Sequence, residues 1–137
     1  MNQTIKLIRL SLGIIFLWYG MLKFFPTLSP AEELATRTID IMFFGLINPL
    51  LSIKLLAILE VSIGIGFLFG FYTRIVTIVF IGHMICTFAP LFLLPELSFT
   101  HAPFAFTLVG QYIVKNIVFI LAGILIYQNE IVAKITK

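Results

Sequence analysis

The stretch "TLVGQYIVKNIVFILAGILIY", from Thr107 to Tyr127, decides the fold class of this chain. An α-helix needs about 20 mostly apolar residues to cross the hydrocarbon of a bilayer, and this stretch is long and apolar enough. It nevertheless carries Gln111, Lys115 and Asn116 close together. Because a lone charge at the centre of a bilayer costs at least about 2.5 kcal/mol, Lys115 needs a partner inside the bundle.

The composition of the whole chain also indicates a membrane protein. The 137 residues are 61% hydrophobic and 11% charged, with a mean hydropathy of +1.14. A soluble domain is about half apolar and a quarter charged, and so short a chain has too little interior to hide the excess. The charges, with a net value of +3, form no basic patch with interleaved aromatics, which argues against nucleic acid as a partner. We expect one integral membrane domain over residues 1–137.

The predicted fold class is all-α, a four-helix transmembrane bundle. The expected membrane spans cover about residues 5–25, 51–72, 75–94 and 107–127. The first span has Lys6 and Arg9 ahead of an apolar run, in the manner of a signal peptide. Because no small-residue cleavage pattern comes after it, we expect a retained helix.

An additional amphipathic helix is expected at about residues 29–47, between the first two spans. Ser29 and Glu32 have the spacing of a capping box, and Pro30 occupies the first helical position. The segment then turns from polar to apolar before Pro49. This pattern favours a helix that lies in the membrane interface, with an ordered loop as the alternative.

The distribution of Lys and Arg predicts the orientation of the bundle. An excess of these residues marks cytoplasmic loops. With both termini in the cytoplasm, the cytoplasmic side holds Lys6, Arg9, Arg74, Lys134 and Lys137. The opposite side holds Lys23, Arg37 and Lys54.

Polar residues of different spans fall at one depth. At about 1.5 Å of rise per residue, Glu60 and Lys115 both lie roughly 12–13 Å below the outer boundary. We therefore predict a buried Glu60–Lys115 ion pair, either as a structural clip or as part of a functional site. Asn116, Gln111 and His83 would satisfy the remaining donors and acceptors. Lys23 shares a stripe with Gly13 and Gly20, so it points inward or snorkels to the headgroups.

Other features of the spans carry weaker signals. His83 and Cys86 are one turn apart, but two ligands without a third predict no metal site. A haem held by two histidines would need His101, which reads as a loop residue. With a single cysteine the chain has no dithiol chemistry, and no resident cofactor is evident.

Two packing features are expected in the second and third spans. Ser62, Gly66 and Gly70 recur at every fourth position, a pattern typical of close helix packing in membranes. Pro90 should remove one backbone hydrogen bond and free the carbonyl of Cys86.

Three stretches give the chain a family resemblance. "RLSLGIIFLWYGMLKFFPTLSPAEELA" (Arg9 to Ala35), "AILEVSIGIGFLFGFYTR" (Ala57 to Arg74) and "TLVGQYIVKNIVFILAGILI" (Thr107 to Ile126) resemble the helices of DoxX-like small membrane proteins. The resemblance implies a four-helix bundle in a bacterial cytoplasmic membrane, among relatives associated with quinone-linked sulfur oxidation and oxidative-stress resistance. It also implies an interior polar set: Arg9, Lys23, Glu60, His83, Gln111, Lys115 and Asn116.

Three functions fit these features. The first is a redox-associated accessory component, in which Lys115, Gln111, His83 and Trp18 donate to a quinone in an apolar slot. Since the chain has no flavin motif and no cysteine pair, the electrons would come from a partner's cofactor. The second is a non-catalytic scaffold in a larger membrane complex, and the third is a proton or small-solute conduit. The expected partners are membrane lipid and either other membrane subunits or further copies of the chain.

Overall fold

The computed structural model describes residues 2–135, with side chains through residue 132. Lys134 and Lys137, which contribute to the predicted orientation, lie outside the described side chains. The elements in chain order are α1 (Gln3–Leu22), α2 (Glu32–Met42), α3 (Pro49–Phe69), α4 (Thr73–Cys86), α5 (Pro90–Leu93), α6 (Pro95–Ser98), β1 (Phe99–His101), β2 (Ala105–Phe106) and α7 (Leu108–Ile135).

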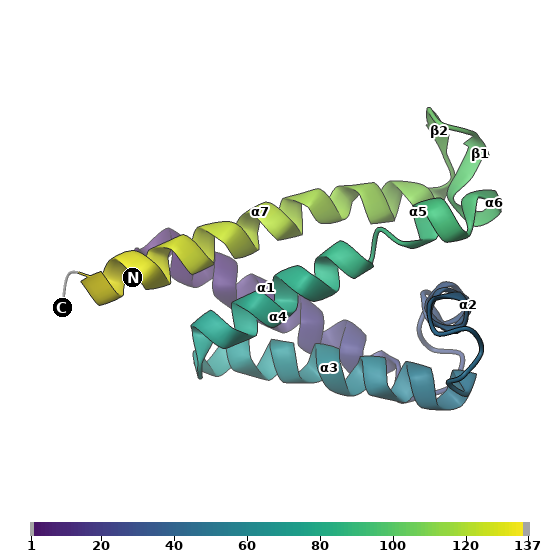
Figure 1. The fold of residues 1–137 in the computed structure, drawn as a ribbon. Coiled ribbons are helices and arrows are strands. Elements are labelled where there is room, and N and C mark those ends of the chain that lie inside the picture. The colour runs from purple at the N-terminus through teal and green to yellow at the C-terminus, as the bar shows by residue number, and fades with distance from the viewer. Residues whose placement is uncertain (1, 136–137) are drawn as a thin grey trace.

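The long helices form an elongated bundle. In Figure 1, α3 and α7 lie on opposite sides, with α1 and α4 between them. Helix α1 packs mainly on α3, and α4 packs mainly on α7. Four helical segments are long and apolar enough to cross a membrane: α1, α3, Thr73–Leu93 with α4 and α5, and Leu108–Val132 of α7. The predicted all-α bundle of four spanning helices is therefore confirmed.

The two ends of the bundle differ in structure. The chain termini lie together at one end, while α2, α5, α6 and the β1–β2 hairpin lie at the other (Figure 1). The hairpin is antiparallel, with Phe99 paired to Phe106. We call the end with α2 and the hairpin the hairpin end. Because α1 starts at the opposite end and the spans alternate in direction, α3 and α7 both start at the hairpin end.

Glycines let α1 and α3 approach closely. A Cβ atom built on Gly64 would lie 2.5 Å from the backbone nitrogen of Leu17, and one on Gly20 would lie 2.9 Å from that of Val61. Gly13 also meets α3, where the backbone nitrogen of Leu68 lies 3.0 Å away. Backbone contact at this distance leaves no room for any side chain, which is why small residues occupy such positions in membrane helices.

The predicted packing stripe of Ser62, Gly66 and Gly70 is wrong as a single face. Gly66 faces Val76 of α4, whereas Ser62 is exposed and donates to the carbonyl of Ile58. Gly70 ends α3 in the left-handed conformation, with φ +74°. The three residues serve three different purposes: Gly66 packs against α4, Gly70 ends α3 against the Arg9 side chain, and Ser62 faces outward.

Apolar side chains fill the centre between the helices. Phe67 and Phe80 are fully buried, and their rings meet edge to face with centroids 5.2 Å apart. Phe16 of α1 packs against Phe80 in the same manner, at 5.1 Å. Ile126 of α7 completes this cluster and is also fully buried. Aromatic pairs of this geometry contribute about 0.5–1.5 kcal/mol beyond their buried area.

Helix α4 ends before Pro90, and the structure corrects the prediction made for that residue. The carbonyl of Cys86 is not free, because the amide of Ala89 donates to it at 3.0 Å. The chain forms turns over residues 87–89, and Pro90 then opens α5 as its first residue. A proline at the first helical position loses no intrahelical hydrogen bond.

Helix α2 begins later than predicted and lacks the expected capping box. It starts at Glu32, and its N-cap residue Ala31 makes no side-chain cap. The carboxylate of Glu32 instead accepts from the backbone amide of Thr27 at 2.8 Å. The helix ends at Met42 rather than near residue 47, because Phe44 and Gly45 adopt positive φ values.

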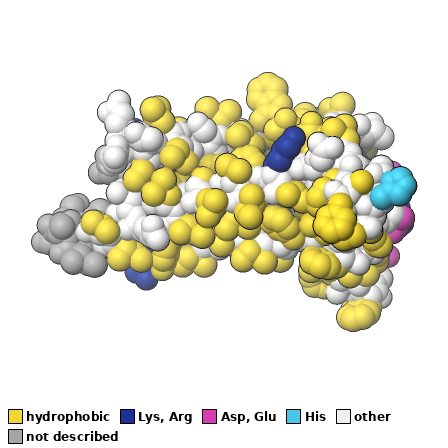
Figure 2. Space-filling view, turned by 90° about the horizontal axis from the view of Figure 1, so that it is seen from above, with side chains coloured by type: hydrophobic (Ala, Val, Ile, Leu, Met, Phe, Trp, Pro, Cys, Tyr) yellow, Lys and Arg dark blue, Asp and Glu magenta, His cyan; other side chains and the backbone are white. Residues whose placement is uncertain are grey.

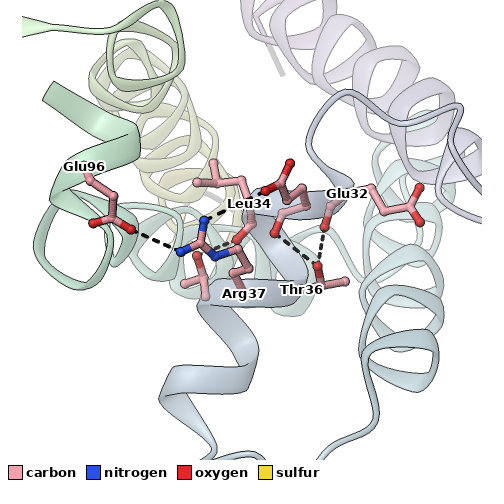
Figure 3. Close-up of polar contacts among 7 residues, drawn as sticks. Glu32, Leu34, Thr36, Arg37 and Glu96 are labelled. Carbon is pink, nitrogen blue, oxygen red and sulfur yellow. Dashed lines mark hydrogen bonds and ion pairs between the residues drawn. The ribbon is translucent and has the colours of Figure 1, made fainter. Parts of the chain in front are cut away.

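Arg37 ties α2 to the rest of the hairpin end. Its guanidinium donates to the carboxylate of Glu96 on α6 at 3.2 Å (Figure 3). Within α2, the hydroxyl of Thr36 donates to the carbonyl of Glu32 at 2.8 Å (Figure 3). The Arg37–Glu96 pair therefore joins segments that are far apart in the sequence.

Candidate functional site: an ion cluster inside the bundle

Three ionisable side chains from three helices meet inside the bundle. The ammonium of Lys23, which directly follows α1, lies 2.5 Å from the carboxylate of Glu60 in α3. His83 of α4 approaches the other carboxylate oxygen, with Nε2 3.3 Å from Oε1. The side chains are nearly enclosed, with exposed fractions of 7% for Lys23, 11% for Glu60 and 8% for His83. We call these three residues the ion cluster.

Helix geometry explains how Lys23 reaches Glu60. Gly20 of α1 lies at the level of Glu60, since a Cβ on Gly20 would be 3.0 Å from the Cβ of Glu60. Lys23 lies one turn further along α1. Side chains on a helix lean toward its N-terminus, so the Lys23 side chain returns to the Gly20 level. Its ammonium also lies 3.4 Å from the carbonyl of Tyr19 as a second acceptor. The inward alternative for Lys23 is thus the one adopted.

His83 is held by aromatic packing rather than by a hydrogen bond. Its ring meets Phe16 edge to face, with centroids 5.9 Å apart. Nε2 lies within ion-pair distance of Glu60, but its direction is unsuitable, and it has no hydrogen-bond partner among the described residues. A buried polar atom without a partner is costly and is often found where a ligand or water binds.

The predicted Glu60–Lys115 pair is wrong. Lys115 is exposed on α7, and its ammonium lies 5.5 Å from the centre of the Tyr112 ring. Successive residues of an α-helix are rotated by about 100°, which places Lys115 on the side of α7 opposite the buried Ile113. Lys115 therefore faces away from the bundle, whereas Glu60 faces its interior.

The two other polar residues of α7 also divide between faces. Gln111 is exposed with Lys115, so it does not contribute to the ion cluster. Asn116 faces inward and donates to the hydroxyl of Thr87 at 2.9 Å. Thr87 follows His83 by one helical turn, and its hydroxyl donates in turn to the carbonyl of Met84. Sequence reasoning missed Thr87, although its i+4 spacing from His83 was a usable signal.

Arg9 lies at the opposite end of the bundle from the ion cluster. It is 7% exposed, and its guanidinium donates to the carbonyl of Phe67 in the last turn of α3. The same group packs against Gly70, which ends α3. A cation at a helix C-terminus interacts favourably with the helix dipole, so Arg9 stabilises the end of α3 and is not part of the site.

Two apolar grooves lie on the outside of the bundle. One, of about 390 Å³, is lined by residues of α1 and α3, including Trp18 and Leu68. The other, of about 420 Å³, lies between α1 and α7. Neither is lined by a residue of the ion cluster. Trp18 is 67% exposed and lies on the far side of α1 from Lys23, so it does not reach the cluster.

The ion cluster has no metal-binding character. Within the part of the chain that the structure describes, no three His, Cys, Asp or Glu side chains are grouped closely enough to hold a metal ion. Cys86 is exposed and lies outside the cluster. The chemistry available at the cluster is that of a carboxylate, an ammonium and an imidazole, which together accept and donate protons.

The fold and the site define a class: a small multi-pass membrane protein with an ion cluster enclosed by its helices. The family model for DoxX matches residues 4–95, which is more than half of the chain and includes all three residues of the cluster. The chain belongs to the DoxX family. A comparison with curated proteins and with solved structures finds no match.

Proposed function

We propose that the protein is a redox-associated accessory component of a bacterial cytoplasmic membrane, in which the ion cluster exchanges protons with a quinone. The observation that carries this proposal is the meeting of Lys23, Glu60 and His83 within apolar helices. Ionisable groups inside a membrane domain are expensive and mark functional sites by default.

The chemistry of the cluster suits a quinone that is reduced nearby. Reduction of a quinone to a quinol takes up two electrons and two protons. The two electrons come from a redox cofactor of a partner protein, since the chain shows no flavin motif and no cysteine pair. His83 has a ring nitrogen without a hydrogen-bond partner beside the carboxylate of Glu60, where it can hydrogen-bond a quinone carbonyl or hand on a proton.

A non-catalytic scaffold is the second candidate, and one observation favours it. The cluster side chains are nearly enclosed, and both apolar grooves lie outside the cluster. In a scaffold, the cluster would only fix the register of α1, α3 and α4.

Binding of decylubiquinone to the purified protein in mild detergent separates the two functions. His83→Gln should weaken binding about fivefold, the loss expected for one hydrogen bond of about 1 kcal/mol. His101→Gln is the matched control, because His101 is exposed on the hairpin. Equilibrium dialysis with quantification of the bound quinone measures both affinities.

The outcomes are distinct. Weaker binding by the His83 variant, with normal binding by the His101 variant, supports the quinone function. The quinone function is rejected, and the scaffold function is favoured, if the wild type binds no decylubiquinone or if the His83 variant binds it as tightly as the wild type.

A further inference from the structure

The outer face of α7 carries polar groups that the rest of the molecule does not use. Gln111, Tyr112 and Lys115 are all exposed, inside the segment Leu108–Val132 that is apolar enough to cross a membrane. The Lys115 ammonium lies 5.5 Å from the centre of the Tyr112 ring, which is 64% exposed. We call these three residues the α7 polar face.

Lys115 has no carboxylate partner in the described part of the chain. Two carboxylates that could have been a counter-ion for Lys115 have other partners: Glu60 contacts Lys23 and His83, and Glu96 contacts Arg37. A cation that faces lipid without a counter-ion is unfavourable, so its partner must come from outside the chain.

The Lys115 ammonium lies near the headgroup level. Its Cα is about 10 Å from the start of α7 at 1.5 Å per residue. The side chain leans toward the helix N-terminus, and its contact with Tyr112 places the ammonium about one turn closer to the hairpin end. Long basic side chains near helix ends reach the interface in this way.

A second cation–tyrosine pair marks the opposite boundary of the membrane. The guanidinium of Arg74 lies 5.7 Å from the centre of the Tyr127 ring and donates to the Tyr127 hydroxyl at 3.4 Å. Tyr112 and Tyr127 are about 22 Å apart along α7. This separation is shorter than the hydrocarbon core of about 30 Å, so the two rings lie a few ångströms inside its boundaries, within reach of the two interfaces for the long basic side chains beside them.

We propose that the α7 polar face binds the phosphate of an anionic phospholipid in the leaflet at the hairpin end. The Lys115 ammonium pairs with a phosphate oxygen, while the Gln111 amide and the Tyr112 hydroxyl donate hydrogen bonds to the headgroup. Lipid chains then cover the surrounding surface, which is largely hydrophobic on the α7 side (Figure 2).

Within the described spanning segments, a second copy of the chain offers no accessible carboxylate near this face. In the described spanning segments the carboxylates are Glu60, which is buried, and Glu130, which lies near the other end of α7. A phospholipid phosphate, in contrast, lies at the depth of the ammonium. The fit of charge and depth therefore favours lipid.

Native mass spectrometry of delipidated protein, titrated with dioleoyl phosphatidylglycerol or dioleoyl phosphatidylethanolamine, tests the proposal. The wild type should bind phosphatidylglycerol more tightly, and Lys115→Met should lower that affinity about fivefold, the effect of about one surface cation. Lys54→Met is the matched control, because Lys54 is also an exposed lysine near the hairpin end of a span but has no aromatic contact among the described interactions.

Three results would overturn the proposal: equal affinity of the wild type for the two lipids, unchanged binding by the Lys115 variant, or an equal loss in the Lys54 variant. Circular dichroism of each variant shows that it is folded, and Lys115→Arg should retain binding. If Lys115→Met instead releases a co-purifying membrane subunit while lipid binding is unchanged, the face binds protein.

Discussion

At the residue scale, the Lys23–Glu60 contact has the largest energetic consequence. Burying two charges is itself costly, so an enclosed ion pair adds little net stability compared with apolar residues of similar size. Removing one partner is different, because the other charge is left in an apolar surrounding without compensation. His83 contacts the other oxygen of the same carboxylate at 3.3 Å, and Lys23 is the closer of the two, at 2.5 Å.

Lys23→Met or Glu60→Gln should each lower the free energy of unfolding in detergent by about 3–5 kcal/mol. The double variant should recover much of the loss, because it leaves no orphan charge. Chemical denaturation followed by circular dichroism measures all three variants. Lys115→Met is the control and should be close to wild type. Simple addition of the two single effects would show that Lys23 and Glu60 do not interact.

At the element scale, backbone contact between α1 and α3 determines how the bundle packs. The nitrogen and Cα of Leu17 border the position where Gly64 would carry a side chain. Backbone atoms cannot move aside as a flexible side chain can, so even a methyl group must push the helices apart. The adjacent ion cluster depends on the same spacing, since Lys23 and Glu60 come from these two helices.

Gly64→Ala should therefore destabilise the protein by about 1–3 kcal/mol, the usual cost of overpacking. Gly82→Ala provides the matched control. Gly82 lies inside α4 with nothing within 4 Å of a Cβ, and alanine is favoured over glycine in a helix by about 1 kcal/mol. Thermal unfolding in one detergent compares the two variants. A Gly64 variant as stable as the Gly82 variant would contradict the close approach.

At the scale of the whole molecule, an exposed ion pair joins α2 to α6 at the hairpin end. Arg37 of α2 reaches Glu96 of α6, with side chains that are 45% and 56% exposed. An exposed pair of this kind contributes about 0.2–1 kcal/mol, and salt weakens it. The contact between α2 and α6 should therefore open more easily than the glycine-packed contact between α1 and α3.

Arg37→Gln and Glu96→Gln should each speed amide hydrogen exchange in α2, by at most about fivefold for a loss of up to 1 kcal/mol. The double variant should exchange no faster than either single variant. In 1 M salt the exchange rate of the α2 amides in the wild type should approach the rate in the variants. The Debye length is then about 3 Å, so salt screens the ion pair. Additive effects of the two substitutions would mean that the pair does not join α2 to α6.

The orientation of the whole bundle is a further prediction. Both termini lie at the same end (Figure 1), and the Lys and Arg bias predicts that this end faces the cytoplasm. In a Cys86→Ala background, an impermeant thiol reagent should label Glu33→Cys on spheroplasts, because Glu33 is 80% exposed on α2. Gln128→Cys, near the other end, should be labelled only after lysis. Labelling of Gln128→Cys on spheroplasts, with Glu33→Cys labelled only after lysis, would show that the hairpin end faces the cytoplasm.

Hydropathy and residue spacing were sufficient for the four spanning helices. Length and apolar content decide whether a helix can cross a bilayer, and the fixed rise per residue gives the level of Glu60 along α3. The start of α2 was less predictable, because the Glu32 side chain accepts from the Thr27 amide rather than completing a capping box with Ser29.

The tertiary structure alone decided which polar residues meet. The rise per residue predicted equal depth for Lys115 and Glu60, but depth is only one of the coordinates of a side chain in a bundle. The rotation of each helix about its axis follows from packing, here from the glycine contacts of α1 with α3 and from Phe16, Phe67 and Phe80. That packing turns Lys23 and His83 toward Glu60 and leaves Lys115 facing outward, because a helix can turn only one side to its neighbours.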